Sequence, residues 1–165
     1  MNREPIKIVG DIIKEIMGLS DQQIFIYNQD FKLPQTSGLF VVIQYNTSQI
    51  YSSTNEFEPT DVGANEILVT QTREDYTINV MSKDDTARTR KEEVILSLNS
   101  NYSRNQQELY QFKIGRVTGN FTNVSELEGA GFYNRFALPI SLLAHYSKTV
   151  STPYYDIFTN SIETN

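Results

Sequence analysis

Between Phe132 and Tyr146, apolar and polar positions alternate with a period of two. The even positions form an almost wholly apolar set and the odd positions are mixed, which is typical of a β-strand with one buried face. Unbroken, this strand would be about 50 Å long at ~3.3 Å per residue. A compact chain of this length is only roughly 40 Å across. We therefore expect the strand either to bend at Pro139 or to project at one end and be held by another chain.

Two segments show helical spacing. Residues 4–17 carry a stripe of apolar side chains, with Pro5 suited to the first turn and Gly18 to the end of the helix. The segment Ser82–Asp85 has the pattern of a capping box, and it predicts a second helix that runs to about Leu98. We expect the buried side of that helix to consist of four apolar residues: Ala87, Val94, Ile95 and Leu98.

The remaining apolar runs predict strands and turns. A second long strand is expected over residues 66–81, with a polar middle at 70–75 outside the core. Shorter strands are expected at 24–27, 39–45, 50–57, 112–117 and 121–128, with a turn at 46–48, a polar loop at 58–65 and an undecided polar stretch at 102–110. Adjacent strands predict an α+β fold: a mainly antiparallel twisted sheet with long β-ribbon strands and two helices on one face. We expect a single domain over residues 1–148 and an extended tail over 149–165.

Charge and composition narrow the functional classes. The net charge of −6 argues against a DNA- or RNA-binding module, because such a module needs a basic patch. An acidic balance suits a protein that must not adhere to nucleic acid, and equally suits ordinary solubility. With no cysteine, the chain has no disulfide and no cysteine-based zinc site. We find no signal peptide and no apolar run of ~20 residues, and so expect a protein that is made in the cytoplasm and has no membrane partner.

The chain offers little catalytic chemistry. Its one histidine, His145, lies on the mixed face of the long strand without a nucleophile motif. Glu126 and Glu128 would point the same way on an extended chain and could form the carboxylate pair of a small hydrolase. Arg88 and Arg90 belong to a small basic group that suits a solvated face or subunit salt bridges better than a phosphate site. We therefore expect no enzyme activity, no metal and no cofactor.

Aromatic residues are abundant: ten tyrosines and nine phenylalanines without a tryptophan. Tyrosine suits protein interfaces, because its ring buries area while its hydroxyl still finds a partner. The tail carries three aromatics close together and must dock on its own domain or on a neighbour. We expect the subunit interface to include nine residues: Arg88, Arg90, Glu126, Glu128, Tyr133, Arg135, Tyr154, Tyr155 and Phe158.

A set of segments in order along residues 70–158 resembles the phage neck or tail-terminator (tail completion) proteins. The segments are Glu74–Ser82, Ala87–Val94, Phe112–Arg116, Asn123–Gly129, Asn134–Phe136 and Tyr154–Asp156. The N-terminal third is similar mainly in its pattern of a helix followed by apolar strands. None of these segments has a catalytic meaning, and no family site residues carry over.

The resemblance implies a structural virion protein, assembled in the host bacterial cytoplasm. It implies a small α+β subunit that closes into a ring, commonly of six copies, on the end of the tail tube. Such a ring ends tube polymerisation and joins the tail to the head connector or head-completion protein, and DNA only passes through its lumen. The alternatives are another tail, baseplate or head-completion component, or a small hydrolase that uses His145 or the Glu126/Glu128 pair.

The two long strands together suggest a β-ribbon. Part of the ribbon would belong to the core and part would be offered to the next subunit. Gly129, Gly131 and Pro139 are then the expected bending points.

Overall fold

The chain folds as an α+β protein built on three very long strands. A computed structural model describes residues 4–26, 38–60, 63–117, 120–128 and 131–153. The long strands are β2 (Phe40–Thr60), β3 (Gly63–Ser82) and β7 (Gly131–Pro153), which pair as antiparallel neighbours in that order. This confirms the expected fold class and the ribbon of long strands.

Short strands complete the sheet. β1 (Ile24–Ile26) runs parallel to the start of β2, and β4 (Phe112–Ile114) pairs with the middle of β7 on the other side. β5 (Thr122–Asn123) and β6 (Glu126–Glu128) also pair with β7, near its beginning. The sheet is therefore mostly antiparallel and open at both sides.

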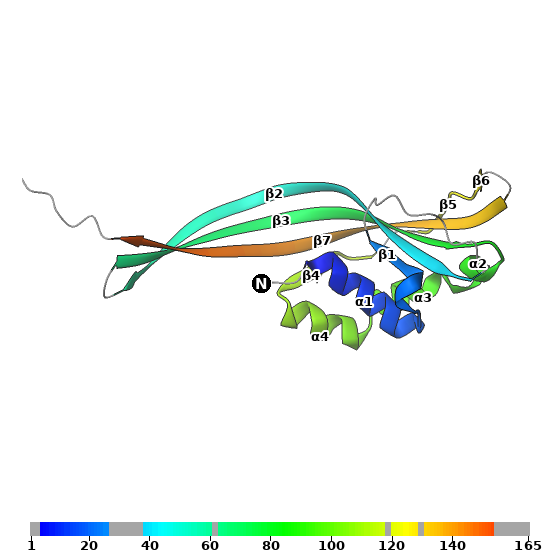
Figure 1. Ribbon diagram of the computed structural model, residues 1–165, viewed down its shortest axis with the longest axis horizontal. Helices are drawn as coiled ribbons and strands as arrows, with labels where there is room; N and C mark the ends of the chain where they lie inside the picture. Colours follow the sequence, from blue (N-terminus) through cyan, green and yellow to red (C-terminus); the bar gives the residue numbers. More distant parts are fainter. Residues whose placement is uncertain (1–3, 27–37, 61–62, 118–119, 129–130, 154–165) are drawn as a thin grey trace, which may run out of the picture.

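The helices cover one face of one half of the sheet (Figure 1). They are α1 (Pro5–Met17), α2 (Thr86–Arg90), α3 (Glu92–Leu98) and α4 (Asn101–Leu109), with a 3-10 turn η1 at Asp21–Gln23. The expectation of two helices was too simple. The second expected helix is divided at Lys91 into α2 and α3, and the undecided polar stretch forms α4.

The core lies between these helices and the sheet. α1 buries a complete apolar face, and α3 adds Val94 and Leu98. Alternate residues of the three long strands meet them from the sheet, as the period-two pattern of β7 predicted. The fully buried strand residues of this core are Val41, Ile43, Ile78, Val80, Leu138 and Leu142. Burial of Ala87 is as expected, whereas Ile95 is only partly buried.

β2 is continuous where the sequence predicted a turn at residues 46–48. The strand instead absorbs extra residues at two register shifts, between Tyr45 and Thr47 and between Ile50 and Ser52. Asn46, a turn-forming residue, bonds through its side-chain amide to the Thr77 hydroxyl at 2.9 Å. Turn propensity thus yields to pairing with β3, and a bulge takes the place of the turn. The polar loop expected at 58–65 is also mostly strand, because Thr60 already pairs with Gly63.

β7 does not bend away from β3 at Pro139, contrary to the expectation that this residue is a bending point. The strand pairs with β3 without a register shift from Asn134 to Pro153, so Pro139 lies opposite Thr77 within the ladder. The backbone groups of Arg135 and Ser141 form hydrogen bonds on the side away from β3, toward β5 and β4. Pro139 is an even number of residues from both, so its backbone groups point to the same side. Its missing N–H therefore faces the gap between β4 and β5, where no ladder bond is lost.

Two other expectations change in detail. The Ser82–Asp85 segment is not a capping box: Ser82 ends β3, and its hydroxyl accepts the Ala87 N–H at 2.9 Å. Residues 149–153, expected in the tail, belong to β7. Gly131 begins β7 opposite Glu128, and Gly129 lies outside the described residues.

Candidate assembly interface

The ends of the three long strands form an arm that leaves the helical layer behind (Figure 1). We define the arm as Ser52–Thr60 of β2, Gly63–Gln71 of β3 and His145–Pro153 of β7. These segments pair residue by residue without a shift, and nine residues extend about 30 Å. The expectation that the long strand projects at one end is thereby confirmed, and two further strands project with it.

Both outer edges of the arm are unpaired in the described part of the chain. β1 covers β2 only at Val41–Ile43, and β4 covers β7 only as far as Ala144. Beyond these points β2 continues for residues 44–60 and β7 for residues 145–153. Each of these segments pairs with β3 on its inner side and has no described strand on its outer side. Unpaired backbone N–H and C=O groups on an edge are a template for another strand.

β2 carries little of the usual protection against such pairing. Residues 44–55 include no charged residue and no proline, although charges and prolines are what natural proteins place on exposed edges. Two bulges interrupt the beginning of this stretch, whereas the part from Ser52 onward is regular. The regular part before the first charge, Ser52–Asn55, is therefore the best template for a partner strand, and Glu56, Glu58 and Pro59 follow it.

Large apolar side chains are exposed on and beside the arm. Ile50 and Phe57 are each 65% exposed, and Tyr51 is 55% exposed. Isolated exposed apolar residues are ordinary, but these three belong to one strand whose edge is also open. The strand offers both hydrogen-bonding groups and apolar area to a partner.

A hydrogen-bonded cluster fixes the base of the arm. The Tyr76 and Tyr146 hydroxyls donate to the two carboxylate oxygens of Glu74 at 2.7 and 2.8 Å. Tyr45 packs edge-on against Tyr76, with ring centroids 5.6 Å apart. These contacts join the three strands where the helical layer ends, so they hold the arm in one direction relative to the core.

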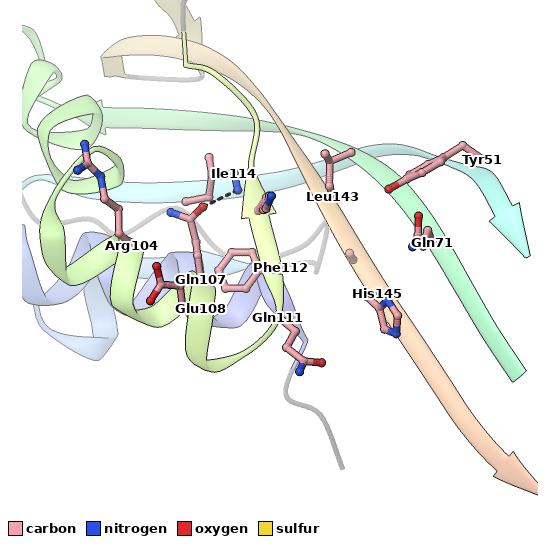
Figure 2. A pocket seen from close by; sticks show the side chains of 12 residues that line it. Tyr51, Gln71, Arg104, Gln107, Glu108, Gln111, Phe112, Ile114, Leu143 and His145 are labelled. Carbon is pink, nitrogen blue, oxygen red and sulfur yellow. Dashed lines mark hydrogen bonds between the residues drawn. The ribbon is translucent and has the colours of Figure 1, made fainter. Parts of the chain in front are cut away.

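A groove of about 770 Å³ lies at the same level, on the β7 side. Figure 2 shows α4 and β4 on one side and the arm strands on the other, with His145 on β7. The lining residues are Tyr51, Gln71, Arg104, Gln107, Glu108, Gln111, Phe112, Lys113, Ile114, Leu143, Ala144 and His145. His145 lies across the groove from Glu108 of α4, and the lining offers it no serine or cysteine nucleophile.

Of the two arginines in the basic group near α2, Arg90 forms contacts within the chain. Arg90 donates to the Met17 carbonyl at 2.8 Å and to the Glu93 carboxylate at 2.6 Å. Its hydrogen bond to Glu93 raises the pKa of Arg90 and lowers the pKa of Glu93, and partial burial opposes both shifts. Arg90 therefore ties α1 to the α2–α3 segment, whereas Arg88 is exposed.

Two expected interface residues lie at the other end of β7. Tyr133 is only 5% exposed, and its ring packs edge-on against Phe40 at 6.2 Å between centroids. The ring belongs to a small second core with Phe40, Val42 and Met81, so it leaves little area for a partner, and its place in an interface stays a prediction. Arg135 donates to the Asn79 side chain at 3.0 Å and is half-buried.

The other expected interface residues are described only in part or not at all. Glu126 and Glu128 have their backbone in β6, paired with Tyr133 and Gly131. Tyr154, Tyr155 and Phe158 lie outside the described residues. The exposed residues Ile50 and Phe57 were missed, although the run from 44 to 58 has no glycine or proline to end a strand.

The described residues offer no metal site and no membrane helix. Among them, no group of three histidine, aspartate or glutamate side chains is placed to hold a metal ion. None of the helices found there is long and apolar enough to cross a membrane.

Fold and site together define a class: an α+β protein with a projecting three-stranded arm and, in its described part, two open strand edges. No model of a known protein family matches the chain, and no curated protein is similar to it in sequence.

Proposed function

We propose that this chain is a structural virion protein of the phage neck. Copies of it would form a ring, of six copies in the resembled family, that caps the tail tube and ends its polymerisation. The same ring would join the tail to the head connector and let DNA pass through its lumen. The protein would act by assembly, without a cofactor.

The observation that carries this proposal is the arm. Within the described residues, a single copy leaves two strand edges unpaired and exposes Ile50, Tyr51 and Phe57 beyond its core. A partner protein would cover both at once, which is the usual reason for an extension of this kind. The ordered resemblance over residues 70–158 supports a ring of copies of the same chain as that partner.

The charge of the molecule supports the passage of DNA. The chain carries a net charge of −6, and an acidic wall repels the phosphate backbone rather than binding it. The ring would thus guide the duplex without holding it.

Native mass spectrometry and negative-stain imaging of the purified full chain test the proposal. We expect a closed ring, either alone or after addition of the tail tube protein. A stable monomer under both conditions would contradict the proposal. Imaging of virions labelled on this protein separates the related functions: a terminator lies between head and tube, a head-completion protein at the head, and a baseplate protein at the far end.

A further inference from the structure

We infer that neighbouring copies join by pairing the β2 edge of one arm with the β7 edge of the next, so that the arms form one closed sheet. The inference rests on the proposed ring and adds how its subunits meet. The paired segments are Ser52–Glu58 of one copy and His145–Ser151 of its neighbour. The partner strand on each open edge is thus a second copy of this chain.

The two edges match in length and height. Through β3, Ser52 is level with His145 and Thr60 is level with Pro153, with no shift between. The open parts of the two edges therefore begin and end together on opposite sides of one ribbon. Copies related by rotation about an axis near the direction of the arm would bring one edge beside the other, with an offset along the strands set only by their tilt.

Charge favours pairing of unlike edges. The regular part of the β2 edge carries Glu56 and Glu58 on the helix-free face, whereas the β7 edge carries no acid, and its lysine, Lys148, lies on the opposite face. Two β2 edges would place like charges side by side, which destabilises a sheet. Pairing of β2 with β7 avoids this, and because the two surfaces differ, the contact can repeat around a ring.

The direction of the strands follows from the topology. β2 and β7 both run antiparallel to β3, so they run parallel to each other within one subunit. Rotation about an axis along the arm preserves that direction. The new pairs between subunits are therefore parallel, while all pairs within each arm stay antiparallel.

The two faces of the arm differ in a way that assigns the inside of the ring. Residues that pair across neighbouring strands point to the same face of a sheet. The face that carries Ile78 and Tyr76 in the core is therefore continuous with one face of the arm. Ile78 and Tyr76 belong to the same core cluster as residues of α1 and α3, and Figure 1 shows the helices on one side of the sheet. The helices are bulky, and a closed sheet has room for them only outside. The helix-free face would then line the lumen.

The helix-free face is polar and acidic. From residue 75 outward its charged side chains are Asp75, Arg73, Glu56 and Glu58, together with Lys113 of β4, which pairs with Leu143. Arg73 and Asp75 form an ion pair at 3.1 Å, so Glu56 and Glu58 stand against Lys113, which gives this face of each copy a net charge of −1. The rest is mainly serine, threonine and amide side chains. Such a wall suits the passage of DNA.

Six arms of three strands would close a sheet of eighteen strands. At a strand spacing of ~4.8 Å and a tilt of ~40°, this sheet would be roughly 35 Å across, in the range where closed sheets leave an aqueous channel. Closure also removes every open edge of the arm, which a dimer does not.

Disulfide cross-linking tests the pairing cleanly, because the natural chain has no cysteine. Thr54 and Ser147 share the helix-free face at the same height. Parallel neighbours at ~4.8 Å lie within the Cα separation that a disulfide accepts. Strand tilt can shift the register by two or four residues, so we would combine Thr54→Cys with Ser147→Cys, with Thr149→Cys and with Ser151→Cys.

We expect one of these three double variants to give a ladder of covalent oligomers up to the full ring, reversed by reductant. Thr54→Cys with Lys148→Cys is the matched control, because the two side chains lie on opposite faces, and it should cross-link at least tenfold less. Thr54→Cys alone should stay uncrosslinked. Dimers from that single variant would show two β2 edges together and overturn the inference.

The outcome also separates the inference from the proposed function. Intact rings in the microscope with none of the three cross-links would overturn the edge pairing and leave the ring standing. A monomer in every variant and in the natural chain would overturn both.

Discussion

Gly115 shows how one residue decides whether a strand can join the sheet. Its N–H donates to the Ser141 carbonyl at 2.7 Å, next to β4. A Cβ at this position would lie 2.7 Å from the Ser141 hydroxyl oxygen and 3.1 Å from the Ser141 carbonyl oxygen. The chain can approach β7 this closely only because glycine has no side chain. The sequence marks the glycine, but only the tertiary contact explains it.

Gly115→Ala should therefore destabilise the fold by about 1–3 kcal/mol, the usual effect of overpacking. Chemical denaturation of the purified protein measures it. Gly38→Ala is the matched control, since nothing lies within 4 Å of a Cβ there, and its effect should stay within ~0.5 kcal/mol. Equal effects at both positions would show that the close approach does not matter.

At the scale of elements, Arg90 links α1 to the segment formed by α2 and α3. The expectation that Arg90 lies in the subunit interface rested on its charge alone. In the structure its guanidinium reaches the Met17 carbonyl at the end of α1, seventy-three residues away in sequence, and Glu93 on α3 neutralises it. A charge pattern on one helix does not reveal such a contact, because the second partner is a backbone group of a distant helix.

The pair makes a pH prediction. Arg90 lowers the pKa of Glu93 in the folded state, so the pair stabilises the protein above the unfolded-state pKa of ~4.3. This contribution is lost as the pH falls through the folded-state pKa. Both side chains are about one-third exposed, so the effect should be small, as for other exposed pairs.

Glu93→Gln should remove that part of the acid destabilisation. Thermal unfolding from pH 6 to pH 3 measures it: the natural chain should lose more stability than the variant does. Glu15→Gln changes the charge equally at an exposed position of α1 and should behave as the natural chain. An identical pH dependence for Glu93→Gln and the natural chain would contradict the prediction.

The whole molecule divides into a core half and an arm half. We expect the core half to be stable without the arm. The buried apolar cluster involves the helices and the strand segments beneath them. The arm beyond Ser52 contributes no residue to this cluster. Stability and assembly should therefore be separable.

An arm-shortened variant tests this separation. It lacks residues 54–59 and the residues paired with them, 64–69, and ends after Ser147. Removal of an even number of residues keeps the faces of the strands in place. We expect an unchanged helical circular dichroism signal and a thermal midpoint within a few degrees of the natural chain, but no ring in native mass spectrometry.

A chain that ends at Pro153 is the control for the tail, because it keeps the whole arm and lacks Tyr154, Tyr155 and Phe158. It should still form the ring. Loss of the ring in this control would move the main contact from the arm to the tail. A ring from the arm-shortened variant would contradict the role of the arm.

The sequence by itself determined the elements whose pattern is periodic over many residues. The apolar alternation of β7, the stripe of α1 and the excessive length of the strands all follow from local chemistry. Overlong strands in a short chain left two possibilities, a bend at Pro139 or a projecting end. The fold class and the ribbon could therefore be predicted.

Tertiary structure decided what depends on distant partners. Pairing with β3 turned Asn46 from a turn residue into a bulge residue, and packing against Phe40 buried Tyr133. Tertiary structure also determined where the arm begins. The arm begins where α4 and β4 end, and no residue pattern in the long strands indicates this position. Local sequence sets what a segment can form, but the neighbours that it meets in three dimensions set which side chains are left for a partner.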